Sequence, residues 1–222
     1  MLRMKYPDDF INKIICGDCL KVMKGIPDKS VDLVLTDPPY GLNKDGVRGD
    51  ADLSLFYNVL PECDRVLKNN SFFITFFSTK FLPQLFKNNP FNYFWQIVLY
   101  CPQGRVRSPI GYTKFMYCSI FKKGNPKIIR LNKDIFIDTP GKMVEPDEGY
   151  INHPTPKPKH FVKEILKMFT KENDLILDPF LGSGTTAVAC KSLRRCYIGI
   201  EISPEYCEMA RKRVNNIPES LF

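Results

Sequence analysis

Five consecutive residues, TDPPY at positions 36–40, bring together groups that could bind an amine. Asp37 supplies a carboxylate and Pro38 a backbone carbonyl, and both groups accept hydrogen bonds. Two acceptors suit a planar exocyclic amine, which offers two N–H donors, and the ring of Tyr40 offers a face on which a base can stack. The stretch therefore predicts a site for an aromatic ring that carries an amino group. The alternative is a proline-rich turn with no chemistry.

A second group of residues has the types and spacing of a nucleotide site. The stretch DPFLGSGTT covers residues 178–186. Gly182 and Gly184 permit close backbone approach there, and Thr185 opens a helix. Glu201 ends the next expected strand, and an acidic residue about 20 positions past a glycine-rich turn holds a ribose diol in nucleotide-binding βαβ units. The turn is neither GxGxxG nor a lysine-containing P-loop, which disfavours a dehydrogenase or an ATPase.

Both groups follow apolar runs that predict buried parallel strands. Residues 31–35 lead into two prolines, which prevent further ladder bonding and force the chain to turn. Residues 175–177 lead into the glycine-rich turn, and residues 13–17 form a short strand that ends in Asp18. Because open α/β sheets bind ligands at the carboxyl ends of their strands, we expect these turns at one edge of a sheet. Asp18 could contact a ligand at this edge, or it could have only the structural role of a turn or helix-cap residue.

Other stretches predict the remaining layers of the fold. We expect a short helix over 20–25, and the spacing of apolar residues indicates helices over 53–67 and 159–169. Apolar runs indicate strands over 71–77, 91–100, 114–121 and 197–200. Residues 122–149 are polar apart from a short apolar run at 135–137, so we expect an excursion from the domain rather than a layer of it. Glycines and polar residues at 41–55 predict a mobile loop that could close over a substrate.

Length and composition place the chain among single-domain globular proteins. It has 222 residues, of which 44% are hydrophobic and 25% charged. The net charge of +8 favours a polyanionic partner without choosing among DNA, RNA and an anionic membrane. Asp8 and Asp9 interrupt any N-terminal apolar run, and residues 72–77 are too few to span a bilayer, so we expect a cytoplasmic protein with no membrane partner.

Cysteine and histidine give no sign of a metal site or of histidine catalysis. Eight cysteines scattered through strands and helices predict reduced, buried thiols. Cys16 and Cys19 form a CxxC, but no second pair has zinc-like spacing, and we predict no metal. His153 and His160 are the two histidines, and neither ends an expected strand, so a histidine base is not expected.

These motifs together resemble a known enzyme family. TDPPY resembles motif IV of the amino-methyltransferases, which methylate adenine N6 or cytosine N4 in DNA. DPFLGSGTT resembles motif I of S-adenosylmethionine-dependent methyltransferases, IGIEISPEY their motif II and HPTPKP, at residues 153–158, their motif X. With the amine motif first and the cofactor motif last, the order resembles the β class of this family. Tyr100 and Cys101 depart from the family, which often has a tryptophan and a lysine before Pro102.

The resemblance implies a fold and a set of site residues. The fold is an α/β, Rossmann-like class I methyltransferase sheet with a circularly permuted motif order, the catalytic half first and the cofactor half last. Residues 1–222 form a single methyltransferase domain in which residues 122–149 are an inserted target-recognition segment. The implied catalytic residues are Asp37, Pro38, Pro39 and Tyr40. The implied cofactor-binding residues are Asp18, which meets the adenine of S-adenosylmethionine, Thr155, Lys157, Asp178, Phe180, Gly182, Ser183, Gly184, Thr185 and Glu201.

The resemblance also implies a reaction. The exocyclic nitrogen of a flipped base displaces the methyl group of the sulfonium directly, without a covalent enzyme intermediate. An aspartate before PPY is usual for adenine in the family and a serine for cytosine, so Asp37 implies adenine N6. Cytosine N4 methylation, or an RNA or protein methyltransferase of the same superfamily, is the alternative, and a catalytically idle nucleic-acid binder is a third hypothesis.

The implied partner is double-stranded DNA, with a possible homodimer and a possible partner restriction endonuclease. Three basic residues could contact DNA phosphates or simply belong to a solvated, charged loop: Arg105, Arg107 and Lys114.

Overall fold

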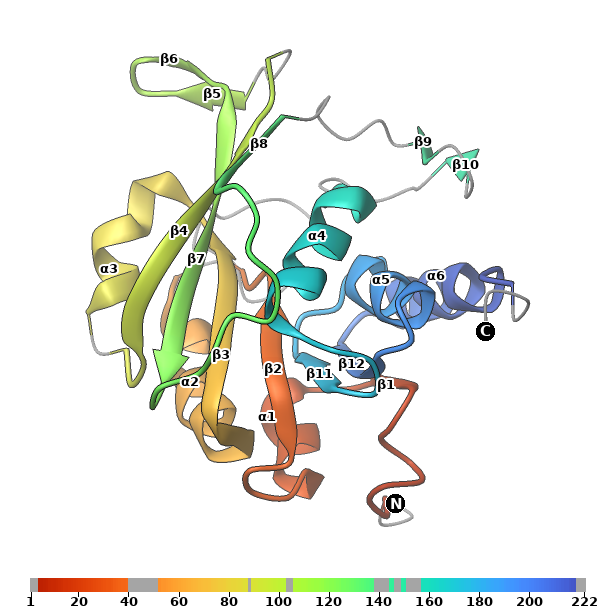
Figure 1. Cartoon of the computed structure of the whole chain (residues 1–222). Helices are drawn as coiled ribbons and strands as arrows, with labels where there is room; N and C mark the ends of the chain where they lie inside the picture. The colour runs from red at the N-terminus through yellow and green to blue at the C-terminus, as the bar shows by residue number, and fades with distance from the viewer. Residues whose placement is uncertain are drawn as a thin grey trace.

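The computed structural model of the chain describes residues 4–39, 52–87, 89–102, 106–137, 144–145, 149–150 and 157–218. Its centre is an eight-stranded mixed sheet between two layers of helices (Figure 1). In sheet order the strands are β1 (Lys13–Cys16), β12 (Cys196–Glu201), β11 (Leu175–Asp178), β2 (Val31–Thr36), β3 (Leu67–Phe77), β7 (Phe115–Lys123), β4 (Asn92–Tyr100) and β8 (Ile135–Ile137).

Five neighbouring strands, from β1 to β3, run parallel, as the apolar runs of the sequence predict. Val31, Leu33, Val34 and Leu35 of β2 are fully buried because helices cover both faces of this part of the sheet. β7 runs antiparallel to β3 and to β4. It follows that β4 points the same way as β2, and the carboxyl ends of these strands lie at one edge of the sheet.

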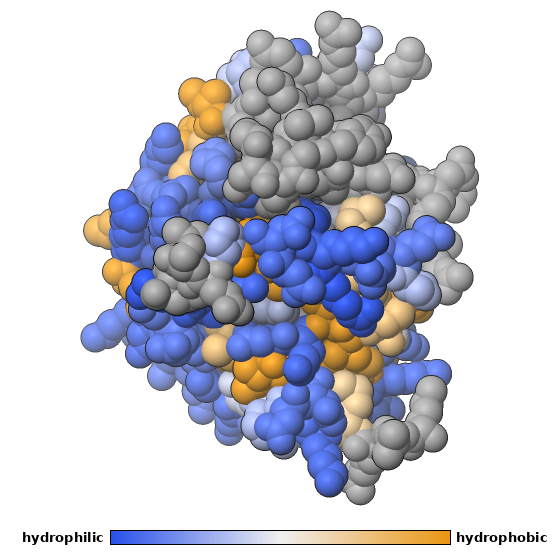
Figure 2. Space-filling model, turned by 90° about the vertical axis from the view of Figure 1, so that its right-hand side faces the viewer, coloured by the Kyte–Doolittle hydropathy of each residue, from blue (hydrophilic) through white to orange (hydrophobic). Residues whose placement is uncertain are grey.

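Two hydrophobic clusters hold the helices to the sheet. One face packs against α4 (Lys159–Phe169), α5 (Thr185–Ser192) and α6 (Pro204–Asn215). The opposite face packs against α1 (Cys19–Val22), α2 (Ser54–Val66) and α3 (Leu82–Phe86). Leu33 and Leu35 of β2 belong to the first cluster and Val34 to the second, which is the alternation of a strand buried on both faces. Figure 2 shows that hydrophilic residues cover most of the described surface on the side of α5 and α6.

Short elements decorate this frame. The 3-10 helix η1 (Met23–Gly25) directly follows α1, and the 3-10 helix η2 (Thr79–Phe81) directly precedes α3. A hairpin of β5 (Val106–Ser108) and β6 (Gly111–Thr113) projects past the ends of β4 and β7 (Figure 1). A second pair consists of β9 (Val144–Glu145) and β10 (Gly149–Tyr150). No helix in the described ranges is both long and apolar enough to cross a membrane.

The structure differs from the expectation for residues 122–149 at one point. We expected no core contribution from this segment, but its apolar run forms β8, which pairs in parallel with Val98–Tyr100 of β4. Phe136 of β8 is buried, and its ring centroid lies 5.4 Å from that of Phe161 in α4. The expectation was wrong here because three apolar residues suffice for an edge strand when a partner strand offers free backbone groups. The target-recognition role of the segment stays a prediction.

Candidate active site

The two sequence motifs meet where β2 and β11 end. These strands are neighbours in the sheet, with Leu177 paired to Val34. From β11 the chain continues through α5 to β12 on one side, and from β2 it continues through α2 to β3 on the other. Such a point of divergence opens a crevice at the carboxyl ends of the strands, and open α/β sheets bind ligands there. The sequence correctly predicted that both turns lie at one sheet edge.

Asp178 ties the two turns together from inside the protein. Its carboxylate is buried and accepts hydrogen bonds from Thr36 Oγ1 at 3.0 Å, Thr186 Oγ1 at 2.6 Å and Phe180 N at 3.1 Å. Burial raises the pKa of Asp178 to about 7, the three hydrogen bonds oppose this rise, and the nearby Asp37 carboxylate adds to it. The geometry gives Asp178 a structural task between the motifs, and its predicted contact with a cofactor stays a prediction.

The glycine-rich turn is held open by its backbone and by α6. Gly182 and Gly184 have φ angles of 55° and 92°, which non-glycine residues rarely adopt. A Cβ atom on Gly184 would lie 2.6 Å from the Cβ of Ala210 in α6, so only glycine fits. Arg213 of α6 donates from Nη1 to the carbonyl of Ser183 at 2.6 Å and meets the hydroxyl of Thr185 at 3.3 Å. The turn therefore has a fixed shape before any ligand arrives.

Glu201, at the end of β12, braces the same turn. Its Oε2 accepts from Gly182 N and its Oε1 from Ser203 N, both at 2.8 Å. A carboxylate has about four lone-pair sites, so each oxygen keeps the capacity to accept one more bond. The structure thus adds a bracing role that the sequence did not reveal, and it leaves room for the predicted ribose contact.

Asp18 lies at the end of β1 and caps a helix. Its Oδ1 accepts from Leu20 N at 2.9 Å at the start of α1, which is the cap that the sequence left open as an alternative. The neighbouring Gly17 N donates to the carbonyl of Glu201 at 2.9 Å, so the ends of β1 and β12 stay adjacent. Contact of Asp18 with the adenine of a cofactor stays a prediction, as does any cofactor contact of the half-buried Phe180.

Asp37 projects from the turn directly after β2. Its Oδ2 forms an ion pair with Lys157 Nζ, which also lies 5.2 Å from the centre of the Phe76 ring. Its Oδ1 is buried and has no hydrogen-bond partner among the residues that the structure describes. A buried acceptor without a donor is costly, and a ligand N–H group would satisfy it. The sequence placed Lys157 with the cofactor residues, and it did not reveal this pairing.

Several predicted residues lie outside the described residues. Among them are Tyr40 and Thr155, most of the loop at 41–55, and Arg105. Pro38 and Pro39 follow Asp37 within the described part. Lys114 donates from Nζ to the carbonyl of Pro102 at 2.9 Å.

All eight cysteines are free thiols, as predicted. Six are buried, but Cys16 is exposed and Cys196 half-buried, so the expectation of burial was wrong for these two, which lie at the ends of β1 and β12. Burial raises the pKa of Cys19 to about 12, so this thiol is not reactive at neutral pH. In the part of the chain that the structure describes, no three His, Cys, Asp or Glu side chains are grouped as metal ligands.

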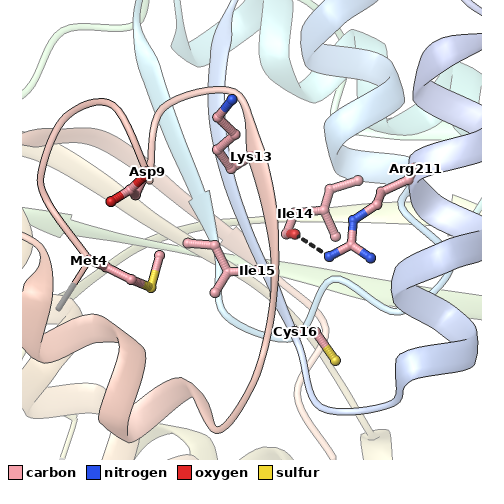
Figure 3. A pocket seen from close by; sticks show the side chains of 7 residues that line it. All are labelled: Met4, Asp9, Lys13, Ile14, Ile15, Cys16 and Arg211. Atoms are coloured by element: carbon pink, nitrogen blue, oxygen red, sulfur yellow. Dashed lines mark hydrogen bonds between the residues drawn. The ribbon is translucent and has the colours of Figure 1, made fainter. Parts of the chain in front are cut away.

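A separate pocket opens at the outer edge of the sheet, along β1 (Figure 3). Its lining residues are Met4, Asp9, Lys13, Ile14, Ile15, Cys16 and Arg211. Arg211 of α6 donates to the carbonyl of Ile14 at 2.8 Å and so caps the free edge of this strand. Two strands, β12 and β11, separate β1 from β2, so this pocket is distinct from the turn that carries Asp37.

Comparison with known proteins yields one family. The family model described as DNA methylase matches residues 132–212. Type II methyltransferase M.HpaI of Haemophilus parainfluenzae is 32% identical over 238 residues, which cover 92% of this chain and 74% of that protein. The M1.HpyAVI–SAM complex superposes with a TM-score of 0.70 at 26% identity over 91% of this chain and 98% of the other. PvuII DNA methyltransferase, cytosine-N4-specific, shares the fold with a TM-score of 0.76 at 21% identity over 93% and 88%.

Proposed function

The chain belongs to the S-adenosylmethionine-dependent DNA amino-methyltransferases, and we propose that it transfers a methyl group from S-adenosylmethionine to adenine N6 in double-stranded DNA. One observation carries this proposal. Asp37 holds a buried carboxylate oxygen, without a hydrogen-bond donor among the described residues, at the sheet edge beside the glycine-rich turn. An exocyclic amine supplies the donor that this oxygen lacks.

The chemistry of the amine explains why it needs such an acceptor. The lone pair of an amino group on a base ring is delocalised into the ring, which makes the nitrogen a poor nucleophile. When the Asp37 carboxylate and the Pro38 carbonyl accept hydrogen bonds from its two N–H groups, the nitrogen is drawn towards pyramidal geometry and its lone pair points away from both acceptors. Bound S-adenosylmethionine would supply the methyl group, and its sulfur would keep the electron pair of the broken sulfur–methyl bond as a thioether. The methylated nitrogen would pass its extra proton to the Asp37 carboxylate and from there to water. No enzyme nucleophile takes part.

The residues of the glycine-rich turn fit S-adenosylmethionine, which supplies an activated methyl group. The positive φ angles of Gly182 and Gly184 leave the turn without side chains at its closest point. Glu201 already braces the turn and keeps acceptor capacity for two ribose hydroxyls. Asp178, at the start of this turn, accepts a hydrogen bond from Thr36 at the end of β2. This bond fixes the position of the glycine-rich turn relative to Asp37, the next residue after Thr36.

The target base must leave the duplex to reach Asp37. The carboxylate lies at the carboxyl end of β2 and is largely buried, and a stacked base inside a duplex does not expose its amine to such a site. Extrusion of the base places its ring where Tyr40, by the sequence prediction, stacks on it. The family resemblance further suggests action as a dimer and beside a cognate restriction endonuclease, and both are predictions.

Parallel methyl-transfer reactions test the proposal. The protein is incubated with tritiated S-adenosylmethionine and duplex DNA, RNA or protein, and methylated DNA is digested to nucleosides that are resolved by mass. We expect label in DNA and the mass and retention of N6-methyl-2′-deoxyadenosine. N4-methylcytosine alone would overturn the choice of base, which rests on Asp37 preceding PPY, and label in RNA or protein alone would overturn the choice of substrate.

A further inference from the structure

Lys157 is the nearest cation to the predicted catalytic carboxylate in the described residues, and no part of the proposed reaction yet uses it. We propose that Lys157 is a positioning residue, which holds Asp37 so that one carboxylate oxygen is engaged and the other faces the target amine. This inference rests on the proposed function and extends it. It gives Lys157 a task different from the cofactor contact that the sequence motif implies.

The geometry divides the two oxygens of Asp37 between two partners. Oδ2 is engaged by Lys157 Nζ, and Oδ1 is buried without a donor among the described residues. A carboxylate free at both oxygens rotates about its χ2 bond, and this torsion is broad and roughly two-fold. The ion pair removes that freedom. The amine of the base then meets an acceptor whose direction is already set, so less ordering remains for the reaction itself.

The lysine is itself held firmly. It lies two residues before the start of α4, its side chain is 14% exposed, and its ammonium group lies over the ring of Phe76 in β3. Helix α4 is fixed to the sheet by buried residues such as Phe161, whose ring contacts those of Phe76 and Phe136. Lys157 and Asp37 are 120 positions apart in the sequence, and packing of α4 on the sheet holds the ammonium group of Lys157 beside Asp37.

Charge supplies a second reason for the pair. In the described part of the site, Asp178 of β11 and Cys118 of β7 interact electrostatically with Asp37, and Lys157 pairs with it. Asp178 carries a buried carboxyl group whose pKa is raised, first by burial and further by Asp37, and burial raises the pKa of Cys118 as well. Lys157 is the positive member of this set. Its ammonium group offsets the repulsion between the two neighbouring acidic groups, Asp37 and Asp178.

Steady-state kinetics on three variants test the inference. Lys157→Met removes the charge and the donors, and Lys157→Arg keeps the charge. As the control, Lys167→Met removes a partly exposed lysine that pairs with Glu164 within α4. For Lys157→Met we expect kcat on DNA to fall about 100-fold, the loss that a misplacement of about 1 Å can cause, with the Kd of S-adenosylmethionine unchanged. We expect Lys157→Arg to restore part of kcat, and Lys167→Met to match the wild type.

Each other outcome has a definite meaning. A Lys157→Met enzyme with wild-type kcat at saturating cofactor but a raised Kd for S-adenosylmethionine would assign Lys157 to the cofactor and overturn the inference, while the proposed function stands. If Lys157→Met does not fold, Lys157→Arg and Lys157→Gln replace it, and equal kcat values for these two would contradict the role of the charge. Failure of the wild type to methylate DNA would overturn the proposed function, and this inference with it.

Discussion

Replacement of Glu201 by alanine should affect both the shape of the glycine-rich turn and the binding of S-adenosylmethionine. In the folded chain the carboxylate accepts from Gly182 N and Ser203 N, both at 2.8 Å. We propose that it also accepts from the ribose hydroxyls of S-adenosylmethionine. The variant therefore loses the brace of the glycine-rich turn and the ribose contact together.

The size of the effect on binding follows from hydrogen-bond energies. A bond to a charged acceptor contributes about 1.5–3 kcal/mol, and about 1.4 kcal/mol corresponds to a tenfold change in Kd. Loss of one such bond to the ribose raises the Kd for S-adenosylmethionine roughly 10- to 150-fold. Because Glu201 is half-buried, water replaces part of the lost backbone bonds, and we expect the free energy of unfolding to fall by only about 1–3 kcal/mol.

Calorimetric titration with S-adenosylmethionine measures the Kd, and urea unfolding measures the stability of the same samples. Glu201→Gln keeps one acceptor oxygen and should lie between the wild type and Glu201→Ala. Glu208→Ala removes a carboxylate of the same kind from the exposed face of α6, where it pairs with Lys212 at 3.7 Å, and should leave the Kd unchanged. A folded Glu201→Ala protein with the wild-type Kd would refute the assignment of Glu201.

Other predictions concern the turn and the buried carboxylate. Gly184→Ala should lower the midpoint of thermal unfolding by more than Gly111→Ala does. Both glycines have a positive φ angle, but only at Gly184 would an added Cβ lie close to a neighbour, 2.6 Å from the Cβ of Ala210. Equal shifts of the midpoint for the two variants would contradict the role of this close contact. For Asp178 the folded pKa of about 7 lies above the ordinary value of 3.8, so the folded state binds more protons and the group costs stability as pH rises between these values. Urea unfolding at several pH values should therefore show the wild type losing stability relative to Asp178→Asn up to about pH 7, and parallel curves for the two proteins would disprove this.

Local sequence signals predicted the elements that carry the candidate site. The run before Asp37 forms β2 because its apolar residues are buried on both faces, and two prolines stop the ladder after Thr36. The helix expected over residues 159–169 has those bounds as α4, since its apolar residues recur on one face. Helix α6 was not predicted, although Ser203 before Pro204 is a helix-start signal, and in the structure Ser203 caps it.

Contacts between distant parts of the chain could not be predicted from local patterns. The pairing of β8 with β4 depends on a free sheet edge, which the sequence of residues 135–137 does not reveal. The same holds for the ion pair between Lys157 and Asp37 and for the hydrogen bond that Gly182 N donates to Glu201. Each joins residues whose types the sequence shows but whose neighbours are fixed only by the folded sheet.

Methyl transfer by an Asp37→Ala variant tests the central claim most directly. The amount of tritiated methyl group incorporated into duplex DNA is measured beside the Kd for S-adenosylmethionine, on protein whose folded state is checked by thermal unfolding. Since Asp37 should touch the target amine and not the cofactor, we predict that turnover is abolished while the Kd stays within about twofold of the wild type. Methylation of DNA by the variant at the wild-type rate would contradict the account.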